Sequence, residues 1–366
     1  MKLYYIIYQD FIKERASNVQ ISNTTNFLYK AGLDINLIFP YKFELPSRYN
    51  ILSKVNFLFD KKFDNFNKFN ILKFSVRFFS FLKKTKDRDH AVYFRHVVLL
   101  PVMLFIKIFL PSTKIIYEIH REVNDNFGKY CEKKLIKKGI KVITISESLK
   151  TLYLSKYKDL QTDQVKVVHD AVDLEKFDIN IDKNDAQHKI GIASDKPIVM
   201  YIGSLWVVKG VDILLAAAKK LPEYNFYFIG KEHKDFTKLK EQYKNIDNIF
   251  IVGPVDHKQV PTCQKAADLL VIPHPKNDLS QSPMKLFEYL ASGVPILSSD
   301  LDNIKEILSD DFLFFKPEDV DDLKNKIRFH FDNKEKYISL AQKNIDIAKQ
   351  YSWQNRSQMI KEFILK

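Results

Sequence analysis

Short apolar runs alternate along this chain with longer stretches in which apolar residues recur every three or four positions. The short runs are typical of buried strands in a parallel sheet, and the longer stretches are typical of the helices that cover such a sheet. The strands expected in the first half are Leu3–Tyr8, Asn36–Phe39, Val92–Phe94, Lys114–Ile119, Lys141–Ile145 and Lys166–Val168. Those expected in the second half are Ile198–Ile202, Asn225–Ile229, Ile249–Val252, Leu269–Ile272, Pro295–Leu297 and Phe312–Phe315.

A polar stretch from Asp170 to Lys196, rich in Asp, Asn and Lys, separates the two halves and is expected to be a linker. The sequence therefore predicts an α/β protein. We expect two Rossmann-like, doubly wound parallel-sheet domains, residues 1–175 and 176–351, facing each other across a cleft. A last periodic stretch, Lys334 to Lys366, predicts a long helix whose end, about residues 352–366, is a candidate to pack back on the first domain.

Ligands of open parallel sheets bind beyond the carboxyl ends of the strands, so the residues that directly follow strands are the candidate site. These residues are Asp10, Arg95, His96, His120, Arg121, His169, Asp170, Gly203, Ser204, Gly230, Lys231, Gly253, Pro254, His274 and Ser298.

The segment that begins at Ser282 predicts a helix whose first turn binds an anion. Ser282 is a good N-cap, Pro283 suits the first helical position, and Gly293 supplies a left-handed stop. The free N–H groups and the dipole at this end favour a phosphate, and Lys285 adds a positive charge in the same turn. Glu288 follows on a neighbouring part of the same face, where it can accept hydrogen bonds from sugar hydroxyls. The combination indicates a nucleoside diphosphate with its ribose.

Composition narrows the class of protein. The 366 residues are 46% hydrophobic and 28% charged, which is typical of a soluble globular protein with two domains. The two cysteines, Cys131 and Cys263, lie far apart and indicate a reducing compartment without a disulfide framework. No secretory signal opens the chain, and the most apolar run, 97–110, is too short to span a bilayer. We expect this run to be a buried helix, with an interfacial helix as the alternative.

The net charge of +13 is concentrated in part of the first half. Between Tyr41 and His90 there are 12 Lys and Arg against 5 Asp and Glu, interleaved with ten Phe. Lysines beside exposed aromatic rings suit an anionic membrane surface. The alternative is that many of these rings are core residues and that the lysines reflect a bias of the whole chain. No nucleic-acid module is present, so nucleic acid is not an expected partner.

Several segments resemble the retaining glycosyltransferases of the GT-B fold, the large family four that uses nucleotide-activated sugars. The resemblance is carried by Tyr201–Leu205, Lys209–Leu215, Ala267–Pro273 and Ser282–Pro295. It is looser at Tyr117–His120, Ile145–Glu147 and Val168–Asp173. It covers nearly the whole chain and implies two GT-B domains.

The resemblance also implies roles for individual residues. Lys209 and Lys285 would bind the diphosphate, Glu288 would hold the ribose hydroxyls, and His120 would face the donor sugar. The implied nucleotide-binding set is Gly203, Ser204, Lys209, Ser282, Met284, Lys285 and Glu288, with His120, Lys209 and Lys285 as the catalytic set. The loops after Ile229 and Val252 would frame the base, and no metal site is expected because the acidic pairs near Asp310 and Asp319 read as helix starts.

The sequence departs from the family pattern at four places. Ser204 stands where Arg is common, Ser280 stands where a second Glu is common, and Asp170-Ala171 stands where Asn-Gly is common. The loop from Asp10 to Ala16 lacks the usual glycines. Lys285 would restore the missing positive charge, as in the Ser-Pro-x-Lys branch of the family.

These features predict a metal-independent hexosyltransferase. It would move a sugar from a UDP- or GDP-linked donor to a glycan or lipid-linked glycan, in bacterial surface polysaccharide or glycoconjugate synthesis. The chain is expected to be cytoplasmic and peripheral on the inner face of the cytoplasmic membrane. One alternative is a GT-B-fold binding protein that has lost turnover. Another is a nicotinamide oxidoreductase, against which the absence of Gly-x-Gly-x-x-Gly after any expected strand speaks.

Overall fold

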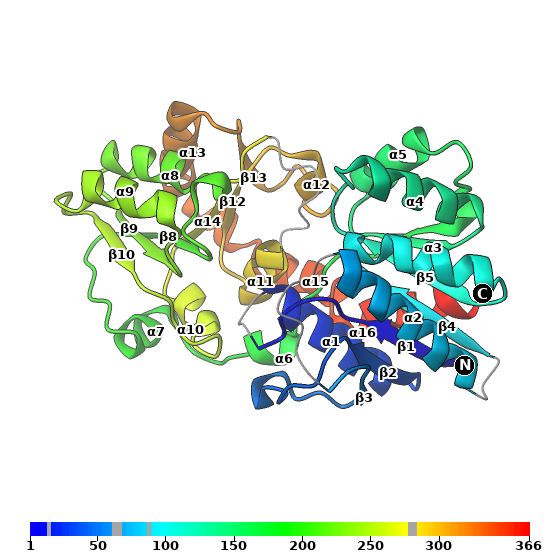
Figure 1. The fold of residues 1–366 in the computed structure, drawn as a ribbon. Coiled ribbons are helices and arrows are strands. Elements are labelled where there is room, and N and C mark those ends of the chain that lie inside the picture. The colour runs from blue at the N-terminus through cyan, green and yellow to red at the C-terminus, as the bar shows by residue number, and fades with distance from the viewer. Residues whose placement is uncertain (13–15, 61–67, 86–88, 277–283) are drawn as a thin grey trace. The chain divides into compact units, whose positions relative to one another are not determined.

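The computed structural model describes residues 1–12, 16–60, 68–85, 89–276 and 284–366, which form two compact units (Figure 1). The first unit consists of Met1–His169 together with Trp353–Lys366, and the second of Asp170–Ser352. The division therefore falls at residue 169 rather than 175. The last helix belongs to the first unit.

The first unit contains a seven-stranded parallel sheet in the order β3-β2-β1-β4-β5-β6-β7. Its strands are β1 (Lys2–Ile6), β2 (Asp34–Phe39), β3 (Lys54–Phe57), β4 (His90–Phe94), β5 (Lys114–Ile119), β6 (Lys141–Thr144) and β7 (Val165–Val167). Its helices are α1 (Ala16–Lys30), α2 (Lys68–Lys84), α3 (Leu100–Phe109), α4 (Asn126–Lys137), α5 (Glu147–Lys156) and α16 (Trp353–Leu365). The sequence did not predict β3, because this edge strand is short and only partly buried.

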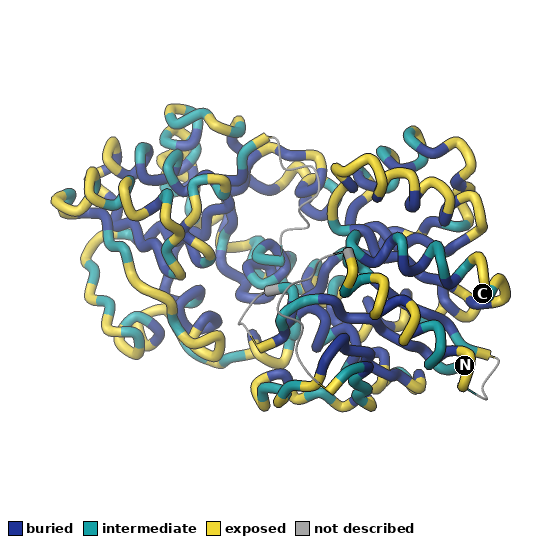
Figure 2. The backbone as a smooth tube through the Cα atoms, in the orientation of Figure 1, coloured by how far each residue is buried: buried dark blue, intermediate teal, exposed yellow. Residues whose placement is uncertain are grey.

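Helices cover both faces of this sheet, because alternate residues of a strand point to opposite sides. Leu3 and Tyr5 of β1 pack in one core with α1 and with Ile360 of α16. Tyr4 and Ile6 pack in the other core with α2, α3, α4 and α5. Figure 2 shows the resulting pattern, with buried strands and exposed outer helical turns.

The second unit contains a six-stranded parallel sheet in the order β10-β9-β8-β11-β12-β13. Its strands are β8 (Ile198–Ile202), β9 (Asn225–Ile229), β10 (Ile249–Val252), β11 (Leu269–Ile272), β12 (Ile296–Ser299) and β13 (Leu313–Phe315). Its helices are α6 (Leu174–Phe177), α7 (Lys183–Lys189), α8 (Val211–Lys219), α9 (Lys234–Tyr243), α10 (Val260–Lys265), α11 (Met284–Ser292), α12 (Asp302–Lys305), α13 (Val320–Asp332), α14 (Lys334–Ile338) and α15 (Ala341–Gln350). The two sheets confirm the predicted doubly wound α/β architecture.

Two sequence predictions about connections are wrong. The expected linker from Asp170 to Lys196 contains α6 and α7 and is part of the second unit, where Ala186 is buried. The expected long helix from Lys334 onward is three helices, α14, α15 and α16. The last break falls at Tyr351-Ser352, where the backbone pairs with Val172 before the chain returns to the first unit.

The apolar run 97–110 forms α3 and the short turn before it, and its buried residues are Leu99, Leu100, Val102, Met103 and Ile106. Its end is not buried, since Ile108 and Phe109 are exposed. Among the helical residues that the structure describes, no helix is long and apolar enough to cross a membrane.

Candidate active site

The first cluster of candidate residues lies in the second unit, where the loops after β8 and β9 touch through their backbones. Gly203 and Gly230 both have φ +150°, a conformation that favours glycine. A Cβ on Gly230 would lie 1.8 Å from the Gly203 carbonyl oxygen, and a Cβ on Gly203 would lie 2.7 Å from Lys285 Nζ. The Leu205 N–H donates to the Lys231 carbonyl at 2.9 Å, which pairs the two loops. The space beside Gly203 is therefore filled by the Lys285 ammonium.

Lys285 is held in the first turn of α11 by contacts with β8. Its Nζ lies 3.5 Å from the centroid of the Tyr201 ring. The Tyr289 hydroxyl accepts a hydrogen bond from the Ile202 N–H at 2.9 Å and so ties α11 to the end of β8. Burial and the nearby charge of Lys209 hold the pKa of Lys285 well below its usual range, against the effect of Glu288. An anion bound beside Lys285 would stabilise its charged form and raise its pKa.

Lys209 and His274 reach the same place from two other loops. Lys209 ends the 3-10 turn Val207–Lys209, and Gly210 follows with φ +73°. A Cβ on Gly210 would lie 1.6 Å from the carbonyl oxygen of Pro273, so the turn packs directly on the backbone after β11. His274 is buried there, and burial together with the charges of Lys285 and Lys209 holds its pKa well below the usual range. The local field at this edge is therefore positive.

Glu288 lies one turn beyond Lys285 on α11 and is partly buried. Burial raises its pKa, while His257, Lys285 and Lys176 oppose that rise. Burial therefore disfavours the charged form of both Glu288 and Lys285 in the absence of a ligand. Hydroxyl donors at Glu288 and a phosphate at Lys285 would each stabilise the charged form.

The structure brings together four of the predicted nucleotide-binding residues, namely Gly203, Lys209, Lys285 and Glu288. Ser204 is in the same loop, and its carbonyl accepts a hydrogen bond from the Tyr201 hydroxyl at 3.0 Å. Met284 is the first residue of α11. Ser282 lies outside the described residues, as do Pro283 and Ser280. The left-handed stop at Gly293 is confirmed by its φ of +71°.

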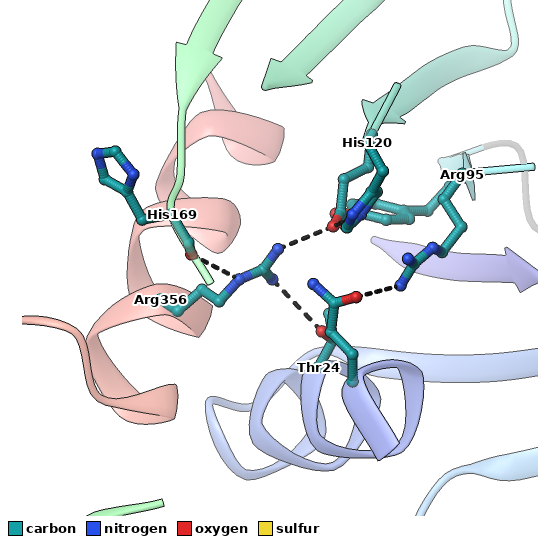
Figure 3. Close-up of polar contacts among 8 residues, drawn as sticks. Thr24, Arg95, His120, His169 and Arg356 are labelled. Carbon is teal, nitrogen blue, oxygen red and sulfur yellow. Dashed lines mark hydrogen bonds and ion pairs between the residues drawn. The ribbon is translucent and has the colours of Figure 1, made fainter. Parts of the chain in front are cut away.

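The second cluster lies in the first unit around His120, directly after β5 (Figure 3). His120 Nε2 lies 2.5 Å from Oε1 of Glu118, which is buried. Arg356 of α16 donates to the same Oε1 at 2.8 Å, to the His169 carbonyl at 2.9 Å and to Thr24 of α1 at 3.3 Å. The Tyr93 hydroxyl donates to Oε2 of Glu118. His120 is thus held by a network that reaches the far end of the chain.

The charge state of Glu118 follows from these contacts. Burial alone would raise its pKa, but the charges of Arg356 and His120 and the His120 hydrogen bond hold the pKa well below its usual range. The carboxyl group is therefore ionised although it is buried. Glu118 and Arg356 were not among the predicted site residues, and only the position of Glu118 two residues before His120 hinted at a role.

His96 and Arg95, which follow β4, have structural partners. His96 accepts a hydrogen bond from the Tyr8 N–H at 3.4 Å and contacts Gln9 Oε1 through Nε2 at 2.9 Å. Burial and the nearby charges of Arg95, His120 and Arg121 lower the pKa of His96 to about 3, so its ring is neutral at physiological pH. Arg95 donates to Gln20 of α1 at 2.6 Å.

Acidic side chains near the two sites form no metal centre within the part of the chain that the structure describes. Asp319, which the sequence suggested as a helix start, is the N-cap of α13 and accepts from the Asp322 N–H at 3.0 Å. Cys263 is buried on α10.

The chain is similar to several known proteins. Residues 182–346, within the second unit, match the family model of glycosyl transferases group 1. An uncharacterized glycosyltransferase of Methanocaldococcus jannaschii, MJ1607, is 25% identical over 227 residues, which are 58% of this chain and 57% of the relative. The putative teichuronic acid biosynthesis glycosyltransferase TuaH of Bacillus subtilis is 26% identical over 144 residues, or 38% of this chain and 35% of TuaH. The chain thus spans little more than half of the first relative and about a third of the second.

Solved structures extend the likeness to the whole fold. HepE of Anabaena in complex with UDP-glucose matches 100% of this chain and 99% of its own, with a TM-score of 0.74 and 15% identity. HepE has also been solved with UDP. The fold is therefore GT-B.

Proposed function

We propose that the protein transfers a sugar from a nucleoside-diphosphate donor to a glycan or lipid-linked glycan. The observation that carries the proposal is the convergence of Lys285, Lys209 and Glu288 at the carboxyl edge of the second sheet. Two ammonium groups beside one carboxylate match a diphosphate joined to a ribose. HepE, of the same fold, was solved with UDP and with UDP-glucose, which supports a nucleotide sugar as the donor.

The residues at this edge suggest how the transfer is accelerated. Breaking the bond between the anomeric carbon and the phosphate leaves negative charge on the departing diphosphate. Lys285 and Lys209 would stabilise this charge more strongly in the transition state than in the bound donor. His120 would hold a hydroxyl of the donor sugar. We expect the reaction to retain the anomeric configuration, as in the family that the sequence resembles.

A screen of nucleotide sugars tests the proposal directly. A specific donor stabilises the folded state by about 2.7 kcal/mol at a hundred times its dissociation constant, so the melting temperature should rise with one donor class only. Donor consumption with lipid-linked and soluble glycans should then identify the acceptor. Absence of stabilisation by every UDP- and GDP-sugar would refute the proposal. Stabilisation without turnover on any acceptor would indicate a binding protein instead.

We further propose that the acceptor is met at an anionic membrane, on the surface formed by α2 and α3. Phe69, Leu72 and Val76 of α2 are exposed, as are Ile108 and Phe109 of α3. The two helices are joined by edge contacts of the Phe79 ring with Phe105 and Phe109, at centroid distances of 5.6 and 6.2 Å. Neither helix contains an acidic residue. An exposed apolar face with cations and no acids suits an anionic lipid surface.

Only part of the segment between Tyr41 and His90 is available for the proposed membrane contact. Phe74 and Phe78 are buried in the core, so part of the Phe series between Tyr41 and His90 is structural. Lys61 and Lys62 lie outside the described residues. Lys73 is exposed, with Nζ 4.3 Å from the Phe69 ring centroid, and Lys83 and Lys84 are exposed at the end of α2.

Liposome co-sedimentation distinguishes electrostatic from apolar docking. Each basic residue at an anionic surface contributes about 1 kcal/mol, so a Lys73→Glu/Lys83→Glu/Lys84→Glu variant should bind markedly less and binding should weaken with salt. Lys129→Glu/Lys133→Glu/Lys134→Glu on α4 is the charge-matched control. Binding that ignores anionic lipid content, or that the α4 variant reduces equally, would contradict the proposal.

A further inference from the structure

Trp206 presents a partly exposed indole ring in the loop that also carries Gly203 and Lys209. It is 37% exposed, and Val208, two residues later, is 45% exposed. The other tryptophan of the chain, Trp353, is only 2% exposed. Single exposed apolar side chains are common on protein surfaces. Trp206 differs from them in the contacts that hold its ring.

The loop after β9 holds both the ring of Trp206 and the backbone beside it. The His233 ring stacks on the Trp206 ring, with a centroid distance of 4.8 Å and an interplanar angle of 29°. His233 Nδ1 lies 2.6 Å from Oδ1 of Asp235, in the first turn of α9. The backbone N–H of Val207 hydrogen-bonds to the same carboxylate. The indole ring is therefore braced from a second loop although it is exposed to water.

Backbone hydrogen bonds fix Trp206 relative to Lys209. The His233 N–H donates to the Leu205 carbonyl at 2.9 Å, and Leu205 forms a parallel bridge with Glu232. The Lys209 N–H donates to the Trp206 carbonyl at 2.8 Å, which closes the turn between them. An aromatic surface that is already ordered loses little conformational entropy when a ligand binds to it. Trp206 thus has the properties of a preformed binding surface.

The position of this surface indicates which part of a substrate would reach it. Glu288, proposed to bind the ribose, is on α11, which packs in the core on one face of the second sheet. Leu205, next to Trp206, packs in the core on the other face with α8 and α9. Lys209, proposed to bind the diphosphate, is in the Trp206 turn. A donor with its ribose at Glu288 and its diphosphate at Lys209 would therefore have its sugar end, not its base, on the Trp206 side.

We propose that Trp206, held by His233 and Asp235, stacks on the apolar face of a hexose ring, either the sugar of the donor or the acceptor sugar that receives it. The C–H groups on one face of a hexose carry partial positive charge and are attracted to the negative face of an indole ring. The position of this sugar relative to the diphosphate rests on the proposed function. The affinity of the braced ring for a sugar does not.

The direct test is NMR of the full-length protein with nitrogen-15-labelled tryptophan. The chain contains two tryptophans, and Trp206→Phe identifies the indole signal of Trp206. If the ring binds the donor sugar, a UDP- or GDP-linked hexose should move this signal further than UDP or GDP alone. If it binds the acceptor sugar, methyl glycosides of glucose, galactose or N-acetylglucosamine should move the signal of the protein saturated with UDP or GDP. A signal that none of these sugars moves beyond its position with UDP or GDP alone would overturn the proposal.

Substitutions then measure what the ring contributes. Trp206→Ala should lower the affinity for the nucleotide sugar, or raise KM for the acceptor, roughly five-fold and leave the affinity for UDP and GDP unchanged. Trp206→Phe keeps an aromatic face and should lose less, and His233→Ala should give an intermediate loss because the ring loses its support. Phe329→Ala on α13 removes a ring that is 47% exposed and is the matched control. An equal loss of affinity for UDP or GDP in Trp206→Ala would overturn the proposal, because the turn would then act only by supporting Lys209.

The two proposals can fail separately. If the protein binds neither UDP nor GDP, the proposed function fails. Methyl glycosides that still move the Trp206 signal would then support the sugar site alone. If UDP or GDP binds but no sugar moves the signal, the nucleotide site stands and the sugar site at Trp206 is refuted.

Discussion

In the first unit, the buried Glu118 carboxylate is matched by Arg356, Tyr93 and His120, and its pKa is well below the usual range. In the second unit, Lys285, Lys209 and His274 lie together, and the charged forms of Lys285 and Glu288 are both disfavoured. The charges of the first unit's cluster are paired with one another, whereas burial in the second unit disfavours the charged forms of Lys285 and Glu288, so a bound diphosphate with its ribose would stabilise both. A preorganised group that orients a substrate needs the first arrangement, and a site that gains much of its affinity from charge needs the second.

Among the substitutions that test the difference between the two units, removal of the Glu288 carboxylate should have the largest effect. Glu288→Ala should remove a pair of charge-assisted hydrogen bonds to the ribose and weaken nucleoside-diphosphate binding by about 2–4 kcal/mol. Calorimetry with UDP and GDP measures the loss, and far-UV circular dichroism checks the fold. Glu318→Ala, a change of the same residue type on the surface, is the control. Unchanged affinity in a folded Glu288→Ala protein would rule out the ribose role.

The next largest effect is expected from Lys285→Met, which removes one charge-assisted contact with the diphosphate. Affinity for the nucleoside diphosphate should fall by about 1.5–3 kcal/mol, while affinity for the free nucleoside should change little. Lys240→Met, which removes a lysine paired with Glu232 at 2.7 Å, is the control. Equal weakening of diphosphate and nucleoside would mean that Lys285 acts structurally.

The lowered pKa of Lys285 also predicts how the stability of the protein depends on pH. The pKa of Lys285 is lowered in the folded protein, so stability is lost as pH falls from the usual lysine pKa toward the folded one. Without ligand, Lys285→Met should therefore be more stable than the wild type at neutral pH, with the difference shrinking as the pH rises and vanishing above about pH 10.4. A bound diphosphate should raise the pKa of Lys285, so binding should take up protons. Calorimetry in buffers of different ionisation enthalpy measures this uptake, which should disappear in Lys285→Met.

A smaller effect is expected from Gly203→Ala, which should displace the Lys285 side chain without removing its charge. The Cβ of Gly203→Ala would lie 2.7 Å from Lys285 Nζ, and its φ of +150° is strained for alanine. We expect KM for the donor to rise several-fold and the melting temperature to fall slightly. Gly32→Ala, at φ +88° with no atom within 4 Å of the new Cβ, controls for backbone strain alone. An effect on KM as large in Gly32→Ala would contradict the assignment.

The smallest effect is expected from metal removal. Because two lysines would supply the countercharge of the leaving diphosphate, treatment with a chelator should leave most of the rate. Activity that is lost completely and restored by magnesium or manganese would show that the lysines alone are insufficient.

The sequence predicted the candidate residues of the second unit far better than those of the first unit, and the reason is the distance along the chain. Lys285 and Glu288 share one helical turn, and strands β8 to β11 lie at the predicted bounds, so the local pattern was sufficient. Arg356 meets Glu118 across 238 positions, and no local pattern links two residues so far apart. The edge strand β3 and the breaks within residues 334–366 were missed for a related reason, because packing rather than periodicity determines them.

The return of the last helix to the first unit also bears on the order in which the protein is made. A ribosome must synthesise all of Asp170–Ser352 before Trp353–Lys366 exists, and domains fold as they emerge. Until then the first sheet lacks one of its covering helices, and Glu118 lacks its cation. During synthesis the first unit therefore lacks α16 until the whole second unit has been made, and the second unit is expected to fold before the first is complete. A protein truncated after Ser352 should resemble this state, with a folded second unit and a loosened first one.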